Sequence, residues 1–410
     1  MTPSKPRTTR GPIQVRFAQR ADAGAISQLY LRTYTPSDGS PARDHYPFPQ
    51  LMDEEKVAAL IEGGTVVWVV AELKGGLIGS AAALRNMGGP RDRVAEIFGV
   101  AVDKTYRRKG VASVLLQALR RGLVDVADFI LCEARTAEAG AWKAAQNADL
   151  QPVGFEPYAH SMPIGFESMT LAAWWRVAPD TPLSGLEPAE NTKACVKFAD
   201  AVFATANRPL SEQGEPVCAE VLAPSIRVRR QDQEGQAWYG SADAVNTQTA
   251  IVELFPFEGV EPRPERFDHA WYVASVGEAE VAVARVLYDH TDARARILGL
   301  RATRPGIEAH FVEGIVADLQ RAANDGPLVV VVCVRAGALA AQIGLEAADF
   351  FPTAYFPSMI STAAGRAGVI QYTRLFHRSW RESIRFVTSI EWPEAKRLID
   401  RVLDETALVS

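Results

Sequence analysis

The first third of the chain alternates apolar runs and helical patterns in an order that favours a mixed α/β sheet. Two apolar runs, VVWVVAEL and LIGSAAAL, flank Lys74-Gly75-Gly76, which is typical of a β-hairpin. A third run, VAEIFGVAV (94–102), precedes a helical stretch to about Val126 and the buried-strand pattern DFILCEAR (128–135). Because a helix between two apolar strands acts as a crossover, some strands are predicted to pair in parallel.

The later part of the chain repeats this order. WYVASV and VAVARVLY form another apparent strand pair, RILGL echoes EIFGV, and PLVVVVCVRA echoes DFILCEAR. Phe155 in GFEPY has a counterpart in Phe350 or Phe351 of DFFPTAY. The repeated order predicts that each half of the chain builds the same supersecondary structure.

The spacing of the two patterns supports a duplication. Ile97 and Cys132 are 35 positions apart, and Ile297 and Cys333 are 36 positions apart. A chance similarity between two strand–helix–strand units is the alternative explanation.

The length of the chain also favours two domains. Its 410 residues exceed the size at which a single hydrophobic core keeps growing. Residues 181–188 are rich in Pro, Ser and Gly, which is typical of a linker. The predicted organisation is a disordered basic tail at 1–13, a first domain at 14–165, a linker at 166–190, a degenerate second domain at 191–390 and a C-terminal helix at 391–410.

Composition argues against several classes of protein. The net charge of −5 disfavours a general nucleic-acid binder but leaves room for a local basic patch. No stretch approaches the 18 or so apolar residues of a membrane span, and the first residues lack a signal-peptide pattern. Because the cysteines form neither a CxxC pair nor a zinc-type cluster, we expect no metal site, no disulfides and a cytoplasmic protein. The cysteines are Cys132, Cys195, Cys218 and Cys333.

The most specific motif is the basic loop RRKGVA (107–112) between a predicted strand and a predicted helix. Gly110 allows a tight turn and a close approach of a ligand to the backbone. The first N–H groups of the helix have no intrahelical acceptor, and the helix dipole adds positive character, so this loop can bind a pyrophosphate. Arg107, Arg108 and Lys109 add positive charge around it. The alternative interpretation is a basic helix start that binds nothing.

The loop, the strands on either side and the following Gly-Phe pair together resemble the GNAT acetyltransferase superfamily. The resemblance covers about Gln14 to Ile164 and is strongest from Val94 to Phe155. It implies a mixed, partly parallel central sheet flanked by helices, and the internal repeat implies two such α/β folds in tandem.

The resemblance also implies a binding mode for an acyl-CoA donor. In that family the loop backbone holds the pyrophosphate of coenzyme A, which assigns Arg107, Arg108, Lys109, Gly110, Val111 and Ala112 to the phosphates. The pantetheine pairs with the edge of the preceding strand, which assigns the backbone of Val100, Ala101 and Val102 to it.

A candidate general base lies on the same strand. AEIFGVAV resembles the histone-acetylating branch of the family, whose catalytic glutamate stands five positions before an Ala-Val pair, as Glu96 does before Ala101-Val102. An amine must lose its proton before it attacks a thioester, and a carboxylate can accept that proton, directly or through water. The alternative is a surface glutamate that begins a strand.

Two features depart from the family pattern. Many GNAT enzymes have a tyrosine four residues before the Gly-Phe pair as general acid, but Leu150 stands there, with Tyr158 and Tyr106 as substitutes outside the motif. A thiol with a pKa near 8.5 can also leave without an acid. In the second half, Pro305 and Glu308 stand where loop donors and basic charge are needed, so that copy is predicted to bind the acceptor or complete the cleft.

The remaining polar residues give weaker signals. His45, His160 and His310 are scattered and are interpreted as structural residues. A basic run near the C-terminus is either a solvated face with interdomain salt bridges or a site for a phosphate-bearing partner. The run consists of Arg366, Arg374, His377, Arg378, Arg381 and Arg385.

Three functions follow from these observations. The first is acyl transfer from an acyl-CoA, most simply acetyl-CoA, to a primary amine of a small molecule, with Glu96 as base. The second uses aminoacyl-tRNA as donor, as some tandem-GNAT proteins of antibiotic pathways do, and the basic tail with Lys5, Arg7 and Arg10 would suit it. The third is a non-catalytic sensor or scaffold that binds CoA. The net charge and the intact loop favour the first.

Overall fold

The computed structural model describes most of the chain outside its N-terminal tail and its longest connections. The described residues are 12–36, 46, 48–87, 91–136, 139–162, 165–176, 191–205, 226–231, 266–303, 307–322, 329–362, 365–376 and 392–407. They form two compact units, of which unit 1 comprises residues 1–84 and 97–124, and unit 2 comprises residues 85–96 and 125–410. The predicted tail, except for its last two residues, and the predicted linker from residue 177 onward lie outside the described residues.

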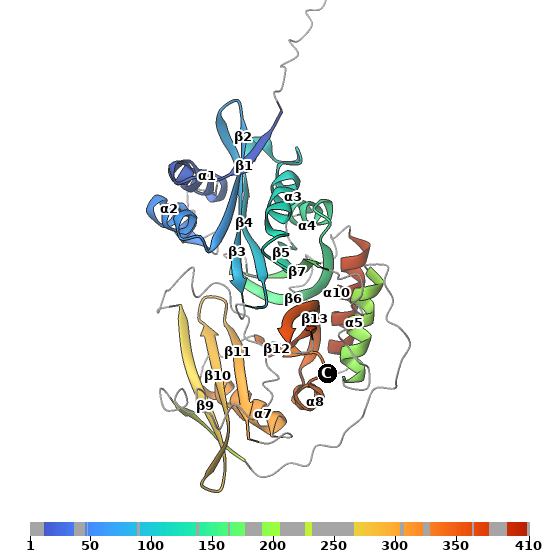
Figure 1. The fold of residues 1–410 in the computed structure, drawn as a ribbon. Coiled ribbons are helices and arrows are strands. Elements are labelled where there is room, and N and C mark those ends of the chain that lie inside the picture. The colour runs from blue at the N-terminus through green and yellow to red at the C-terminus, as the bar shows by residue number, and fades with distance from the viewer. Residues whose placement is uncertain are drawn as a thin grey trace, which may run out of the picture. The chain divides into compact units, whose positions relative to one another are not determined.

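Unit 1 contains four strands in the order β1-β2-β3-β4, with β1 antiparallel to β2 and β2 antiparallel to β3. Figure 1 shows α1 and α2 on one face of these strands and α3 on the other. The boundary with unit 2 passes through β3 and β4, after Leu84 and before Ile97. The elements are β1 (Gln14–Phe17), α1 (Ala23–Tyr34), α2 (Glu54–Glu62), β2 (Val66–Leu73), β3 (Gly76–Met87), β4 (Val94–Val102) and α3 (Val111–Leu123).

In the described part of unit 2, ten further strands follow in the order β5-β7-β6-β13-β14-β12-β11-β10-β9-β8. Strands β11 and β12 are parallel and the other described pairs are antiparallel, which confirms the predicted mixed, partly parallel α/β sheet flanked by helices. The elements are β5 (Phe129–Arg135), α4 (Ala139–Asn147), β6 (Gln151–Met162), β7 (Gly165–Trp175), α5 (Lys193–Thr205), β8 (Arg227–Gln231), β9 (Phe267–Val276), β10 (Ala279–Asp289), β11 (Arg294–Ala302), α7 (Glu308–Ala322), β12 (Val329–Arg335), α8 (Leu339–Ala347), β13 (Phe351–Thr362), β14 (Gly365–Leu375) and α10 (Pro393–Ala407).

Two segments of the chain have the same structure at an offset of 200 residues. In the β6/β7 pair Gln151 lies opposite Ala173, and in the β13/β14 pair Phe351 lies opposite Thr373, with register shifts at matching points of both pairs. Left-handed backbone at non-glycine residues recurs at the same offset, at Arg93, Asp149 and Tyr158 and again at Ala293, Asp349 and Ser358. We call residues 91–205 the first repeat and residues 291–407 the second repeat.

The register of the strands corrects two predicted correspondences by one or more residues. Phe129 and Val329 both pair with the last residue of β7 or β14, so the counterpart of Cys132 is Val332 rather than Cys333. The counterpart of Phe155 is Tyr355 rather than Phe350 or Phe351, because both pair at equivalent positions of β7 and β14. Valine-rich strands of uniform hydrophobicity carry little information about register, which explains the slip.

The end of the first predicted domain also differs from the prediction. Residues 166–175, predicted as the start of a linker, belong to β7 and pair with both β5 and β6. The sequence FESMTLAAWW lacks Pro and contains buried apolar residues, which fit a central strand better than a linker. The other predicted boundaries remain predictions.

The two repeats meet within unit 2 at β6 and β13, where Gly154 pairs with Ala354. Helices α5 and α10 lie side by side, and α5 packs on β13 while α10 packs on β6, so each repeat covers a strand of the other (Figure 1). The ring centroids of Phe203 on α5 and Tyr355 on β13 are 5.6 Å apart. This exchange of helices makes the two repeats one folding unit at this point.

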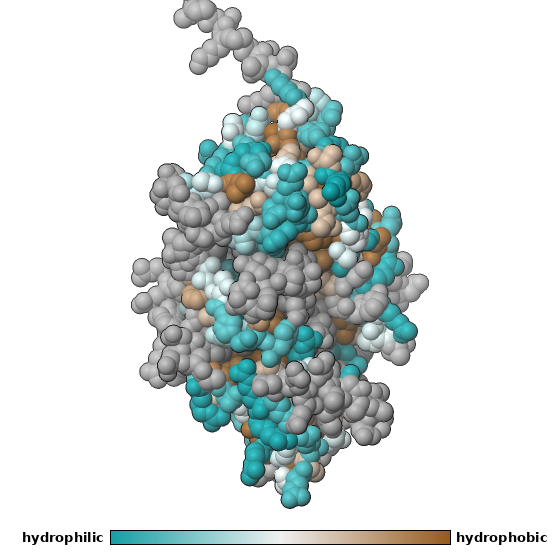
Figure 2. Space-filling view, turned by 90° about the vertical axis from the view of Figure 1, so that its left-hand side faces the viewer, coloured by the Kyte–Doolittle hydropathy of each residue, from teal (hydrophilic) through white to brown (hydrophobic). Residues whose placement is uncertain are grey.

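The surface of the described residues is mainly polar. On the face shown in Figure 2, hydrophilic residues predominate and hydrophobic ones are scattered between them. Among the described residues, the large apolar side chains that are more than a third exposed are Phe17, Val114 and Val126. None of the described helices is long and apolar enough to cross a membrane.

The close contact between the repeats at Gly154 can be tested by adding a methyl group there. A Cβ atom added at Gly154 would lie 2.3 Å from Cβ of Ala354 and 2.5 Å from the carbonyl oxygen of Thr353, so the two backbones must separate. We expect Gly154→Ala to lower the free energy of unfolding by about 1–3 kcal/mol in urea titrations. Gly140→Ala is the matched control, because an added Cβ there meets no atom within 4 Å. Equal stability of the two variants would contradict this account of the junction.

Candidate functional site

The predicted phosphate loop in unit 1 has the backbone that an anion site needs. Gly110 lies immediately before α3 with φ 79°, in the left-handed region that favours glycine, and Arg108 adopts φ 59°. A Cβ atom at Gly110 would meet nothing within 4 Å, so the space in front of the first turn is open. The first turn of α3 contains no acidic residue. Its N–H groups and dipole therefore face that space without a competing negative charge from the first turn.

The basic side chains of the loop are exposed but differ in their contacts. Arg107, Arg108 and Lys109 are all exposed. Lys109 Nζ donates to the carbonyl oxygen of Thr105 at 2.6 Å and lies 4.8 Å from the ring centroid of Tyr106. Two of the three predicted cations thus extend from the loop, while the third is held against the preceding turn.

Strand β4 has left-handed backbone at Gly99, just before the residues predicted to pair with pantetheine. Gly99 has φ 62°, and its carbonyl oxygen accepts a hydrogen bond from the Tyr30 hydroxyl. The Tyr34 hydroxyl donates to the carbonyl oxygen of Val100 at 3.2 Å. Two tyrosines of α1 therefore hold the backbone of β4 at this point. The role of the Val100–Val102 backbone in ligand binding remains a prediction.

The start of α3 packs directly on β3. A Cβ at Gly79 would lie 2.8 Å from Cγ1 of Val111 and 3.4 Å from the carbonyl oxygen of Ala101. Val111 is buried, whereas Ala112 is half-buried. Close backbone packing therefore fixes the N-terminus of α3 beside the end of β4, within unit 1.

Glu96, the predicted base, is buried in unit 2 beside other charged residues. Its exposed fraction is 2%. Burial, and next the negative charge of Glu133 on β5, raise the pKa of Glu96 well above its ordinary value, and Arg296 and His160 oppose this rise. The structure thus brings the predicted base together with three charged groups that the sequence analysis did not assign to a site.

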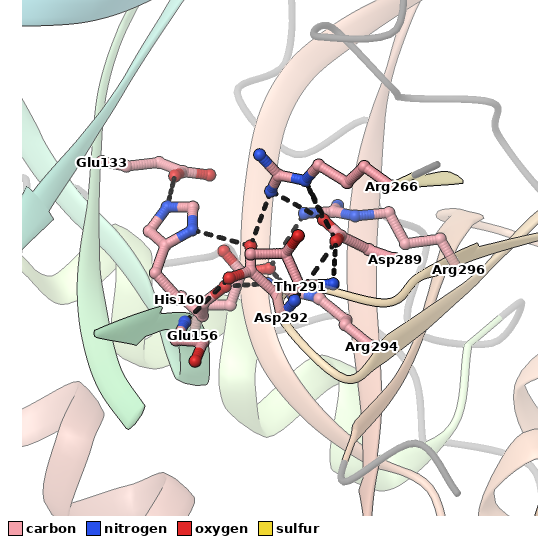
Figure 3. A network of polar contacts seen from close by, with 11 residues as sticks. Glu133, Glu156, His160, Arg266, Asp289, Thr291, Asp292, Arg294 and Arg296 are labelled. Atoms are coloured by element: carbon pink, nitrogen blue, oxygen red, sulfur yellow. Dashed lines mark hydrogen bonds and ion pairs between the residues drawn. The ribbon is translucent and has the colours of Figure 1, made fainter. Parts of the chain in front are cut away.

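His160 lies between two carboxylates (Figure 3). Its Nδ1 is 3.0 Å from Oδ2 of Asp292, and its Nε2 is 3.7 Å from Oε2 of Glu133. Burial lowers the pKa of His160, but the two carboxylates outweigh burial and raise the pKa to about 10. Burial raises the pKa of Glu133, but the hydrogen bond from His160 and nearby positive charges outweigh burial and lower it. At neutral pH His160 is therefore an imidazolium and Glu133 a carboxylate.

Further ion pairs surround His160 and its two carboxylates. Arg266 Nη2 lies 2.8 Å from Oδ2 of Asp289 and 2.9 Å from Oδ2 of Asp292. Glu156 pairs with Arg294, and Arg296 Nη2 is 3.6 Å from Oε1 of the same glutamate. We call Glu96, Glu133, Glu156, His160, Arg266, Asp289, Asp292, Arg294 and Arg296 the charged cluster. The sequence analysis found only Glu96 as functional and interpreted His160 as structural.

The substitutes for the missing tyrosine occupy different environments. Tyr158 is buried in a cluster with Val329 and Val331, and its ring packs edge-on to Phe166 at 6.0 Å. Tyr106 is half-buried beside Lys109. Leu150 itself is buried. Neither tyrosine gains support from the structure as a general acid.

Of the basic C-terminal run, only Arg366 and Arg374 lie in the described residues, and both are engaged. Arg366 donates to the carbonyl oxygens of Ser358, Met359 and Asp92 at 2.7 Å each. Arg374 donates to the carbonyl oxygen of Ala348 at 2.8 Å. These two arginines are engaged within the fold, and the remaining residues of the run, His377, Arg378, Arg381 and Arg385, lie outside the described residues.

In the second repeat, Glu308 begins α7 and places a carboxylate in its first turn, while Pro305 lies outside the described residues. Among the described residues, no group of three or more His, Cys, Asp or Glu side chains is placed to hold a metal ion.

Comparison with known proteins identifies one segment of the chain. Residues 25–145 match the model of the acetyltransferase (GNAT) family. No match was found among curated proteins. This segment includes Glu96, the strand end Val100–Val102 and the loop Arg107–Ala112.

Several solved structures are similar at low sequence identity. A GNAT-family acetyltransferase from Streptococcus pneumoniae is 15% identical, with a TM-score of 0.34 over 40% of this chain and 100% of its own. NAA60 from Arabidopsis thaliana in complex with acetyl-CoA is 15% identical, with a TM-score of 0.32 over 40% of this chain and 98% of its own. The ribosomal-protein-S18-alanine N-acetyltransferase from Escherichia coli is 17% identical, with a TM-score of 0.32 over 42% and 99%. At these scores the assignment depends on the family match alone.

The charged cluster predicts which ion pairs matter for stability. Glu156 is 1% exposed. Neutralising its carboxylate leaves the buried guanidinium of Arg294 without this carboxylate partner. We expect Glu156→Gln to destabilise the protein by about 3–5 kcal/mol in urea titrations. Glu62→Gln breaks the exposed pair with Arg20 and should cost under about 1 kcal/mol. If the two variants are equally stable, the cluster does not depend on charge compensation.

Proposed function

We propose that this chain is an N-acyltransferase of the GNAT type, as the family match over residues 25–145 supports, and that it moves an acyl group, most simply acetyl from acetyl-CoA, to a primary amine of a small molecule. The observation that carries this proposal is the loop before α3. Gly110 is left-handed and open in front, and the first turn of α3 carries no acidic side chain. Arg107 and Arg108 are exposed beside it. These properties suit the pyrophosphate of a CoA thioester.

Glu96 is proposed as the base. It stands four residues before Val100 on β4, so a single strand carries both the proposed base and the backbone proposed to hold pantetheine. A bound acyl-CoA would supply the thioester carbonyl. The amine nitrogen attacks it, Glu96 accepts the amine proton, and the C–S bond breaks to release a thiolate, which takes a proton from water. The raised pKa of Glu96 makes it a stronger proton acceptor than an ordinary carboxylate once it is ionised.

The other two functions receive less support. An aminoacyl-tRNA donor needs free cations, but Arg366 and Arg374 are engaged with backbone carbonyls, and the rest of the basic run lies outside the described residues. A non-catalytic CoA-binding protein does not need a buried carboxylate that is coupled to a second carboxylate and an imidazolium. Acyl transfer from CoA therefore remains the proposal.

Donor binding is tested at the loop. Gly110→Asp adds a side chain and a negative charge where the pyrophosphate is proposed to bind, and we expect it to abolish acetyl-CoA binding in isothermal titration calorimetry. Gly75→Asp is the matched control, because Gly75 also has positive φ, 76°, and open space around its Cβ position. If Gly110→Asp binds acetyl-CoA as tightly as the Gly75→Asp protein, the loop is not the donor site.

The role of Glu96 is tested by Glu96→Gln, which keeps the shape of the side chain and removes its proton acceptor. We expect turnover to fall by about 10²–10⁴ with unchanged acetyl-CoA affinity. The wild-type enzyme should lose activity as the pH falls through the raised pKa of Glu96, because the base must be ionised. Glu62→Gln on the exposed surface should behave as wild type. Unchanged turnover of Glu96→Gln across the neutral pH range would assign the base elsewhere.

A further inference from the structure

Two aspartates at equivalent positions of the repeats make the same backbone contact. Oδ1 of Asp92 accepts a hydrogen bond from the N–H of Ser361 at 2.8 Å. Oδ1 of Asp292 accepts one from the N–H of Ser161 at 2.7 Å. Each aspartate thus binds the serine of the opposite repeat, and all four residues belong to unit 2.

The two aspartates differ in what else they reach. The second carboxylate oxygen of Asp292 lies 3.0 Å from Nδ1 of His160, one residue before Ser161. The residue at the corresponding position before Ser361 is Ile360, which has no ionisable group. An imidazole therefore follows this contact at Asp292, where the opposite repeat supplies His160, and not at Asp92, where it supplies Ile360.

The extension reaches the strand beside the proposed base. His160 carries the positive charge to within 3.7 Å of Glu133 on β5, whose side chain is 19% exposed, and β5 is the sheet neighbour of β4, which carries buried Glu96. The counterpart of Glu96 in the second repeat is Arg296, and it too belongs to the cluster (Figure 3). The charged groups that act on Glu96 are thus Glu133 from β5, His160 from β6 and Arg296 from β11.

We propose that the second repeat is a working part of the active site of the first: Asp292 holds His160 against Glu133, and His160 and Arg296 supply the positive charge that allows Glu96 to act as a base beside Glu133. The proposal rests on the proposed function, in which Glu96 is the base. His160, Asp292 and Arg296 are positioning residues here, because they act on the base rather than on the substrate.

Ionisation of Glu96 beside Glu133 requires nearby positive charge. Two neighbouring carboxylates with low exposure cannot both ionise without compensation, since like charges at short range repel strongly in a site of low dielectric. A fixed imidazolium keeps Glu133 ionised, and a guanidinium reduces the repulsion that Glu133 exerts on Glu96. Without these cations Glu96 would stay protonated to a higher pH and would be a base only in more alkaline solution.

The first test measures the pH dependence of acyl transfer by the full-length protein. In Arg296→Gln one of the cations that favours ionised Glu96 is lost, so the acid limb of the pH–rate profile should move to higher pH by about one unit. Arg296→Lys keeps a cation and should restore most of the shift. A purely structural effect of Arg296 would lower turnover at every pH and leave the midpoint of the acid limb in place.

The second test follows the His160 imidazole by NMR in the same protein. Asp292→Asn should lower the pKa of His160 from about 10 toward the ordinary value of 6.5. Asp92→Asn is the matched control, because it removes the charge at the equivalent serine contact, where no imidazole stands, and it should leave the titration of His160 unchanged.

The outcomes separate the inference from the proposed function. If the wild-type protein transfers no acyl group at any pH, the proposed function is wrong and the inference falls with it. If the wild-type protein is active but Arg296→Gln has the wild-type midpoint, the inference alone is wrong. It is also wrong if Asp292→Asn and Asp92→Asn affect the titration of His160 equally.

Discussion

Glu96 is buried near the carboxylate of Glu133. Two carboxylates with little exposure to water repel each other, and the surrounding charged residues offset the free-energy cost of that repulsion. A buried negative charge is tolerated only with nearby compensation. In unit 2 the compensation comes from His160 and Arg296, while Asp292 and Arg266 hold His160 and one another in place. The first repeat supplies Glu96, Glu133, Glu156 and His160, and the second repeat supplies Asp292, Arg294 and Arg296. The charges therefore link the two repeats in addition to the contacts at β6 and β13.

Much of the fold could be predicted because it depends on patterns that are local in the sequence. Apolar runs separated by a glycine turn and a crossover helix specified a mixed sheet, and the family assignment over residues 25–145 is confirmed. The predicted correspondence of Cys132 with Cys333 was wrong by one residue. A valine-rich strand has the same hydrophobic pattern after a shift of one position, so its sequence does not fix the register. The prediction was also wrong at residues 166–175, where strand pairing with distant β5 overrode the expected linker.

In the candidate site, too, the residues that are contiguous in sequence were predicted and those that are distant in sequence were missed. The loop at Gly110 was found because its residues are contiguous, and the structure gives Gly110 the left-handed backbone that the motif requires. Glu133, Asp292 and Arg296 were missed because strands of two repeats bring them together from far apart in sequence. One signal was present in the sequence: the counterpart of Glu96 in the repeated pattern is an arginine, a reversal of charge between equivalent positions.

The central claim is that this chain transfers an acyl group from a CoA thioester to an amine. The most direct measurement incubates the full-length protein with isotope-labelled acetyl-CoA and a panel of primary amines, and follows both the release of free CoA thiol and the mass of each amine. The account predicts a labelled acetyl group on at least one amine, with one thiol released for each group transferred. Tight binding of acetyl-CoA with neither thiol release nor a mass shift on any amine would contradict it and would favour a CoA-binding protein without catalysis.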